Sequence, residues 1–107
     1  LIALAERPTA ILVDNNLGGV GVVRALLQAG ISIGHEVSVV VNDGVPPDTL
    51  LIGQNVAAVA QPTAYDSGQT MAAMLLTLIE GKPLEQPQVM RQPVFVDGST
   101  LGPAPGG

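Results

Sequence analysis

The sequence contains no cysteine, and only four of its 107 residues are basic. Without cysteine the chain has no disulfide bond and no thiolate chemistry, which is compatible with a cytoplasmic location. The four basic residues are scattered along the chain and are outnumbered by nine acidic ones, for a net charge of −5. Surfaces that bind nucleic acid need clustered Lys and Arg to neutralise phosphates, so we expect no DNA binding by these residues themselves.

Long apolar runs and internal repeats are missing too. No apolar run reaches the roughly 18 residues of a membrane span, so we expect no membrane partner. The first residues lack the basic start and the full apolar core of a signal peptide. Leu1, Leu4 and Ala5 look like the last turn of a helix, and we take the sequence to be a piece of a longer protein. Its length and its hydrophobic content of 47% fit one globular α/β domain.

Groups for metal binding or nucleophilic catalysis are also scarce. His35 is the only histidine, and no cysteine is present to share a metal with it. Ser38 lies in a predicted strand and has no candidate histidine base. We therefore predict that the protein is not an enzyme, with no catalytic residue, no metal site and no cofactor.

A cluster of glycines follows the first predicted strand. Gly18, Gly19 and Gly21 fail the dinucleotide fingerprint G-x-G-x-x-G/A, because Arg24 stands at its last position when the pattern starts from Gly19. We interpret them as sites of close helix packing, on the sheet or on a partner chain.

Residues 9–43 have the pattern of a strand, a helix and a second strand. The apolar run Ala10–Val13 predicts a strand buried on both faces. A helical pattern follows and ends at Gly30, and the run Val37–Val41 predicts the second strand. The sequence thus predicts a βαβ unit with parallel strands and a right-handed crossover.

Polar side chains follow both strands of this unit. Asp14 and Asn15 come after the first strand, and Asn42 and Asp43 come after the second. In open parallel sheets ligands bind outside the carboxyl ends of the strands, and these groups suit the hydroxyls of a small polar ligand. The alternative is that they are only helix caps and turns, which by itself explains Asn15.

The rest of the chain predicts a loop and three further elements. They are the loop 44–54, a strand within Asn55–Ala60, a helix from about Tyr65 to Ile79 and a strand over Met90–Val96. Thr63 or Asp66 is the expected N-cap of this helix.

Three features of these elements carry further expectations. The apolar stripe of the helix is expected to fill the core, and it consists of Met71, Met74, Leu75 and Leu78. Pro93 argues for an edge position of the last strand. The glycine- and proline-rich residues 98–107 predict a flexible tail.

Three segments together resemble the end of the lactose-repressor/galactose-repressor (LacI/GalR) family. In order, they are PTAILVDNNLGGVGVVRALLQAGISIGHEVSVVVND, VAAVAQPTAYDSGQTMAAMLLTLIEG and RQPVFVDGST. The resemblance covers the chain from about Arg7 to Pro103. It implies a partial periplasmic-binding-protein-like (type I) fold, from a two-lobed effector domain that follows an N-terminal helix-turn-helix.

The resemblance also implies a division of the chain. Residues 1–107 would be the C-terminal segment of an effector (sugar)-binding domain, with 1–54 mainly in its C-terminal lobe. Residues 55–80 would be a crossover strand and helix, partly in the other lobe. Residues 81–97 would bring the return strand, followed by the flexible tail 98–107.

Six residues are candidate ligand contacts. By the resemblance, Asn15 and Asp43 match the effector-contacting asparagine and aspartate of the C-terminal lobe. Gln61 and Thr63 match the crossover into the other lobe, and the strand-end argument adds Asp14 and Asn42. The chain departs from the family at Asn42, where an aromatic residue is usual.

The function implied is that of the effector-binding part of a cytoplasmic bacterial transcriptional regulator. A sugar or polyol would bind between the lobes of a homodimer and change the operator affinity of an N-terminal helix-turn-helix. One alternative is the sugar-binding receptor of an ABC transporter, which shares the fold. Another is a standalone dimerisation module, which would associate without responding to a ligand.

Overall fold

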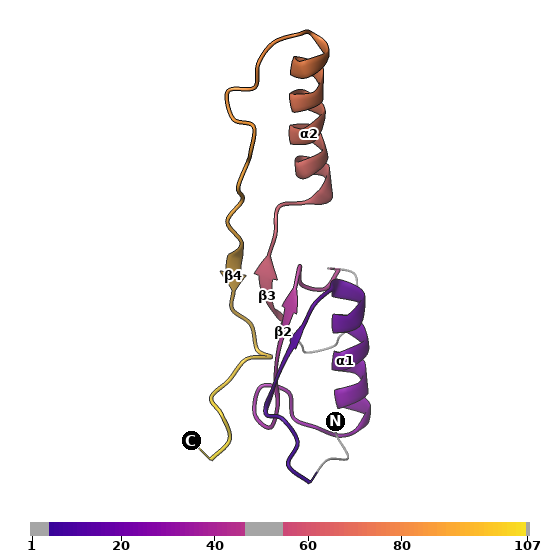
Figure 1. Ribbon diagram of the computed structural model, residues 1–107. Helices are drawn as coiled ribbons and strands as arrows, with labels where there is room; N and C mark the ends of the chain where they lie inside the picture. The colour runs from indigo at the N-terminus through magenta and orange to yellow at the C-terminus, as the bar shows by residue number, and fades with distance from the viewer. Residues whose placement is uncertain (1–4, 47–54, 107) are drawn as a thin grey trace. The chain divides into compact units, whose positions relative to one another are not determined.

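A computed structural model of the chain describes residues 5–46 and 55–106. The elements in these ranges, in chain order, are β1 (Ala10–Val13), α1 (Asn16–Gln28), β2 (Ser38–Asn42), β3 (Ala57–Ala60), α2 (Ala64–Ile79) and β4 (Val94–Val96) (Figure 1). They fall into two compact units, one made of residues 1–60 and 94–107 and the other of residues 61–93. None of the helices in the described ranges is long and apolar enough to cross a membrane.

The first unit is built on a mixed sheet with the strand order β1-β2-β3-β4. β1 pairs with β2 in parallel, and β2 pairs with β3 in parallel. β4 is antiparallel to β3 and lies at the edge, as Pro93 predicts. The parallel pairing across α1 confirms the predicted α/β class and the βαβ unit. The carboxyl ends of β1, β2 and β3 therefore lie at the same end of the sheet, called the carboxyl edge below.

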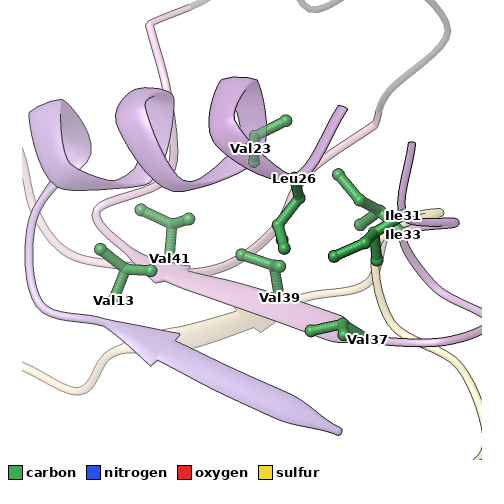
Figure 2. Close-up of a cluster of buried hydrophobic side chains, with 8 residues drawn as sticks. All are labelled: Val13, Val23, Leu26, Ile31, Ile33, Val37, Val39 and Val41. Atoms are coloured by element: carbon green, nitrogen blue, oxygen red, sulfur yellow. The ribbon is translucent and has the colours of Figure 1, made fainter. Parts of the chain in front are cut away.

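The hydrophobic core of this unit lies between α1 and the sheet, as Figure 2 shows. Its members are Val13, Val23, Leu26, Ile31, Ile33, Val37, Val39 and Val41. Alternation along β2 points Val39 and Val41 toward the helix, and both are fully buried. Gly19 packs on this cluster so closely that a Cβ there would lie 2.6 Å from Cγ1 of Val41. This contact confirms the predicted close packing for Gly19, whereas a Cβ at Gly21 would meet no atom within 4 Å, so the prediction is wrong for Gly21 within the described residues.

The other face of β1 does not match the prediction of burial on both faces. Leu12 is 74% exposed, whereas Val13, one residue on, is buried against α1. The apolar run predicted two covered faces, but in the described part of the chain only the α1 side of β1 is covered. The prediction is therefore wrong for β1 within this chain.

The tail also differs from the prediction over its first residues. Thr100 is completely buried. Its Oγ1 donates to Val39 O at 2.7 Å and accepts from Ala57 N at 2.9 Å. Its carbonyl oxygen accepts from Val39 N at 2.8 Å. β3 begins opposite Val40, so Thr100 occupies the place beside β2 that an earlier start of β3 would fill. The glycine and proline content suggested flexibility, but these hydrogen bonds fix the chain here.

The second unit consists of α2 and the segment that follows it. Thr63 is the N-cap of α2, and its Oγ1 accepts from Asp66 N at 3.1 Å. The predicted core stripe is not buried, because Met71 is 69% exposed and Leu75 58% exposed. No residue of this fully described helix is buried. The prediction that the stripe fills the core of this chain is therefore wrong.

Three other expectations concern boundaries. The predicted strand Met90–Val96 is shorter, because only Val94–Val96 pair with β3. Proline at position 93 has no N–H for the ladder, which explains a start after it. The predicted helix end at Leu1 and Leu4, and most of the loop 44–54, lie outside the described residues.

Candidate functional site

Three of the predicted strand-end residues are joined at the carboxyl edge of β1 and β2. Asn15 Nδ2 donates to Asp14 Oδ1 at 2.9 Å, and Asn42 Nδ2 donates to Asp14 O at 3.2 Å. Asp14 and Asn15 are exposed, and Asn42 is half-buried. The edge of the sheet therefore presents a connected set of amides and carboxylates to solvent.

Asn15 has a structural role as well. It is the N-cap of α1, its backbone is extended at φ −150° and ψ 164°, and its Oδ1 accepts from Gly18 N at 2.7 Å. This confirms the cap interpretation of Asn15. A cap does not exclude a ligand contact, because an amide nitrogen carries two hydrogens and an amide oxygen two lone pairs.

Asp43 stands directly after β2 in an uncommon conformation. Its φ is +68°, and it is the only residue other than glycine with positive φ in the described ranges. Its N–H donates to Val59 O at 2.9 Å, and Gly44 N–H donates to Val41 O at 3.1 Å, which closes a turn around it. Left-handed backbone costs a residue other than glycine about 1–3 kcal/mol, and such residues concentrate at functional sites.

The Asp43 carboxylate is the most available group at this edge. The residue is exposed, and its side chain has no hydrogen bond or ion pair with any of the described residues. By contrast, the other acid at this edge, Asp14, already accepts from Asn15. Because its backbone is fixed, Asp43 presents its carboxylate at a defined place, and a carboxylate can accept two hydroxyl hydrogens of one ligand.

Gln61 and Thr63 belong to the second unit. Gln61 directly follows β3 in the chain, and the Thr63 hydroxyl caps α2. The structure therefore brings together the candidates of the first unit, whereas a ligand role for Gln61 and Thr63 stays a prediction.

No metal-binding cluster is found in the ranges that the structure describes. His35 is exposed in the turn before β2. The nearby Glu36 accepts from Ser32 N at 2.7 Å and forms an ion pair with Arg7 at 3.1 Å, so its carboxylate organises this turn.

Thr100 is a fully buried residue whose structural role the sequence-based prediction missed. It lies at the amino end of β2, and it joins β2 to β3, the two strands whose carboxyl ends flank Asp43. The only signal in the sequence was the run of small residues Gly98-Ser99-Thr100. In the structure, Gly98 approaches the backbone of Asn55 closely.

Comparison with known proteins places this geometry in a family. The model of the periplasmic binding protein-like domain matches residues 1–101. The chain is 41% identical over 102 residues to the HTH-type transcriptional regulator RafR of Escherichia coli, covering 94% of this chain and 30% of RafR.

A solved structure agrees with this match. It is described as that of a transcriptional regulator from Yersinia pestis biovar Microtus, and it superposes with a TM-score of 0.84 at 38% identity. The match covers 97% of this chain and 37% of that one. The chain thus spans about a third of the length of these relatives. It belongs to the periplasmic-binding-protein-like domain family, in the form that LacI-type transcriptional regulators carry.

Proposed function

We propose that this chain is the part of a transcriptional regulator that binds a small sugar-like effector through Asn15 and Asp43. Effector binding changes the operator affinity of a helix-turn-helix domain in the same protein, which acts as a cytoplasmic homodimer. The two units correspond to portions of the two lobes, with the return strand in residues 81–97 leading back to the first unit. The chain itself is not an enzyme.

The observation that carries the proposal is the conformation of Asp43. Its left-handed backbone is held by the hydrogen bonds of Asp43 N and Gly44 N, while its carboxylate has no partner among the described residues. Ligands bind at the carboxyl ends of parallel strands and strained residues concentrate at functional sites, so a fixed acid at this edge suits a polyhydroxylated ligand. Asn15, on the neighbouring strand end, adds an amide to the same edge.

The regulator is favoured over the receptor of an ABC transporter by the relatives. Both a curated relative and a solved structure that this chain resembles over nearly its full length are described as transcriptional regulators. DNA binding must come from another part of the protein, because basic residues in this chain are few and scattered. We therefore expect the 107-residue chain alone to show no specific operator binding at physiological salt.

The test uses the full-length regulator and two substitutions of Asp43. Asp43→Asn removes the charge and keeps a side chain that tolerates positive φ, and Asp43→Gly removes the side chain and relieves the backbone. We expect Asp43→Gly to weaken the effector response by at least about a hundredfold, since two hydrogen bonds to a carboxylate at roughly 1.5–3 kcal/mol each amount to about 3 kcal/mol or more. Stability should change by less than about 1 kcal/mol. The measurement is an effector titration of operator-bound protein by fluorescence anisotropy.

Asp97→Asn is the matched control. It removes the same charge from a residue that follows β4, and since β4 is antiparallel to β3, Asp97 lies at the opposite edge of the sheet. We expect wild-type effector response from this variant. An unchanged titration midpoint in both Asp43 variants would show that the strand-end edge is not the effector site.

A further inference from the structure

Asn42 connects the two strand ends of the candidate site. The backbone pairing of β1 and β2 ends at Val13 and Val41. One residue further on, Asn42 Nδ2 donates to Asp14 O at 3.2 Å. The side chain thus adds a cross-strand hydrogen bond just past the last backbone pair of the ladder.

On the β1 side, this bond leads directly to Asn15. The acceptor residue, Asp14, also accepts the amide of Asn15 at 2.9 Å. Asn15 is in turn fixed to α1 by the hydrogen bond from Gly18 N at 2.7 Å. The bond of Asn42 thus ends on the backbone of the residue whose carboxylate holds the Asn15 amide.

On the β2 side, Asn42 is the residue before Asp43. The Asp43 N–H is bound to Val59 O of β3, so the acid is held from the β3 side by its own backbone. The bond of Asn42 holds the same stretch from the β1 side. Asp43, with its φ of +68°, thus sits between two anchors on opposite sides.

We infer that Asn42 is a positioning residue that sets the distance between the Asn15 amide and the Asp43 carboxylate. This inference rests on the proposed function, because it takes both groups to bind one saccharide. Hydrogen bonds weaken steeply when their geometry departs from the optimum, and binding groups need placement within about 0.5 Å. Loss of the Asn42 amide therefore weakens saccharide binding without removing either contact.

The first experiment measures saccharide affinity of the full-length regulator by isothermal titration calorimetry. Glucose, galactose, maltose, sucrose and raffinose are tested on wild type, and the tightest of the five is the probe for all variants. Asn42→Ala is expected to weaken binding of the probe about fivefold to tenfold, which corresponds to about 1–1.4 kcal/mol, the contribution of an ordinary hydrogen bond. Asn55→Ala, the same change just before β3 at the opposite edge of the sheet, is expected to leave affinity unchanged.

A double-mutant cycle separates positioning from general destabilisation. If Asn42 acts by placing Asp43, then Asn42→Ala weakens binding less than about threefold once Asp43→Asn is present. The same loss in both backgrounds overturns the inference, because the two residues then act independently. Thermal melts of each variant, followed by circular dichroism, confirm that the fold is retained.

The remaining outcomes distinguish this inference from the proposed function. If Asp43→Asn weakens the probe and Asn42→Ala does not, the inference is wrong and the proposed function stands. If wild type binds none of the five saccharides, or Asp43→Asn binds the probe as wild type does, the proposed function fails and the inference fails with it.

Discussion

The two helices in the described part of the chain have similar apolar content, but one is buried on one face and the other is not. α1 buries Gly19, Val23 and Leu26 against β1 and β2. α2 is longer by three residues, 16 against 13, and none of its residues is buried. Both begin with a side-chain cap, Asn15 in one and Thr63 in the other. Local sequence signals thus define both helices equally well, while burial differs completely.

The difference shows what an apolar stripe can and cannot predict. A stripe predicts that one face of the helix is to be covered, but it does not say by what. For α1 the cover lies in the same unit, contributed by strands that flank the helix in sequence. The apolar side chains of α2 are left exposed, and a bare face of this kind favours association with other chains.

Self-association is the largest effect expected from the bare face of α2. We expect the 107-residue chain to form a dimer or higher oligomer in the micromolar range, about 8 kcal/mol of association free energy. Leu75→Lys, on the exposed stripe, is expected to yield monomers, because a charge in an apolar contact is costly. Sedimentation equilibrium gives the mass of each. A monomeric wild-type chain with a concentration-independent melt would show that the bare face does not drive association.

Truncating one leucine in each helix compares the two environments directly. Leu26→Ala in α1 is expected to lower the free energy of unfolding by about 3 kcal/mol, because Leu26 is 3% exposed. Leu75→Ala in α2 is expected to change it by less than about 0.5 kcal/mol at protein concentrations where the chain is monomeric. Urea unfolding of both variants is the measurement. Equal losses would mean that α2 is covered within the chain.

Two threonines offer a smaller contrast. Thr100→Val keeps the shape but removes the hydroxyl between Val39 O and Ala57 N, so we expect a loss of about 2 kcal/mol from the groups left unpaired. Thr77→Val removes a hydroxyl that donates to Ala73 O at 3.0 Å on the surface of α2, and should change stability by less than about 0.5 kcal/mol. Urea unfolding of both threonine variants gives the two changes in the free energy of unfolding. A Thr100→Val variant as stable as wild type would show that the buried hydroxyl contributes nothing net.

The smallest expected effect comes from adding one methyl group to each helix. Gly19→Ala places a Cβ against Val41, and the resulting overpacking is expected to outweigh the helix propensity gained, for a net loss of about 1 kcal/mol. Gly68→Ala in α2 meets no atom within 4 Å and is expected to stabilise the helix by about 0.5–1 kcal/mol. Effects of the same sign in the thermal melts would contradict the distinction between the two faces.

The sequence predicted the first unit well because its signals are local. The apolar runs around the strands, the cap at Asn15 and the stop at Gly30 each lie within the element that they define. The edge that carries Asp14, Asn15, Asn42 and Asp43 followed from the parallel pairing alone. The uncommon φ of Asp43 had one hint, since Asn-Asp-Gly is a run of residues that tolerate positive φ.

What the sequence did not reveal depends on distant partners. Thr100 is buried by strands that lie far from it in the chain, and composition marked its surroundings as flexible. Likewise, the bond between Asn42 and Asp14 O joins residues 28 positions apart and depends on where the β1–β2 ladder ends. Such features require the register of the sheet, which no local pattern contains.

The hydrogen bonds of Thr100 to β2 and β3 have a consequence for how the sheet forms during translation. The hydrogen-bond partner of Val39, Thr100, lies 61 residues further along the chain and is synthesised later. At about 5–20 residues per second, the ribosome delivers that partner roughly 3–12 s after Val39, while hairpins and helices form within microseconds. The βαβ unit therefore exists for seconds with the early edge of β2 open. During that interval the open edge of β2 can pair with a neighbouring nascent chain, and the arrival of residues 99 to 102 closes it with its own chain.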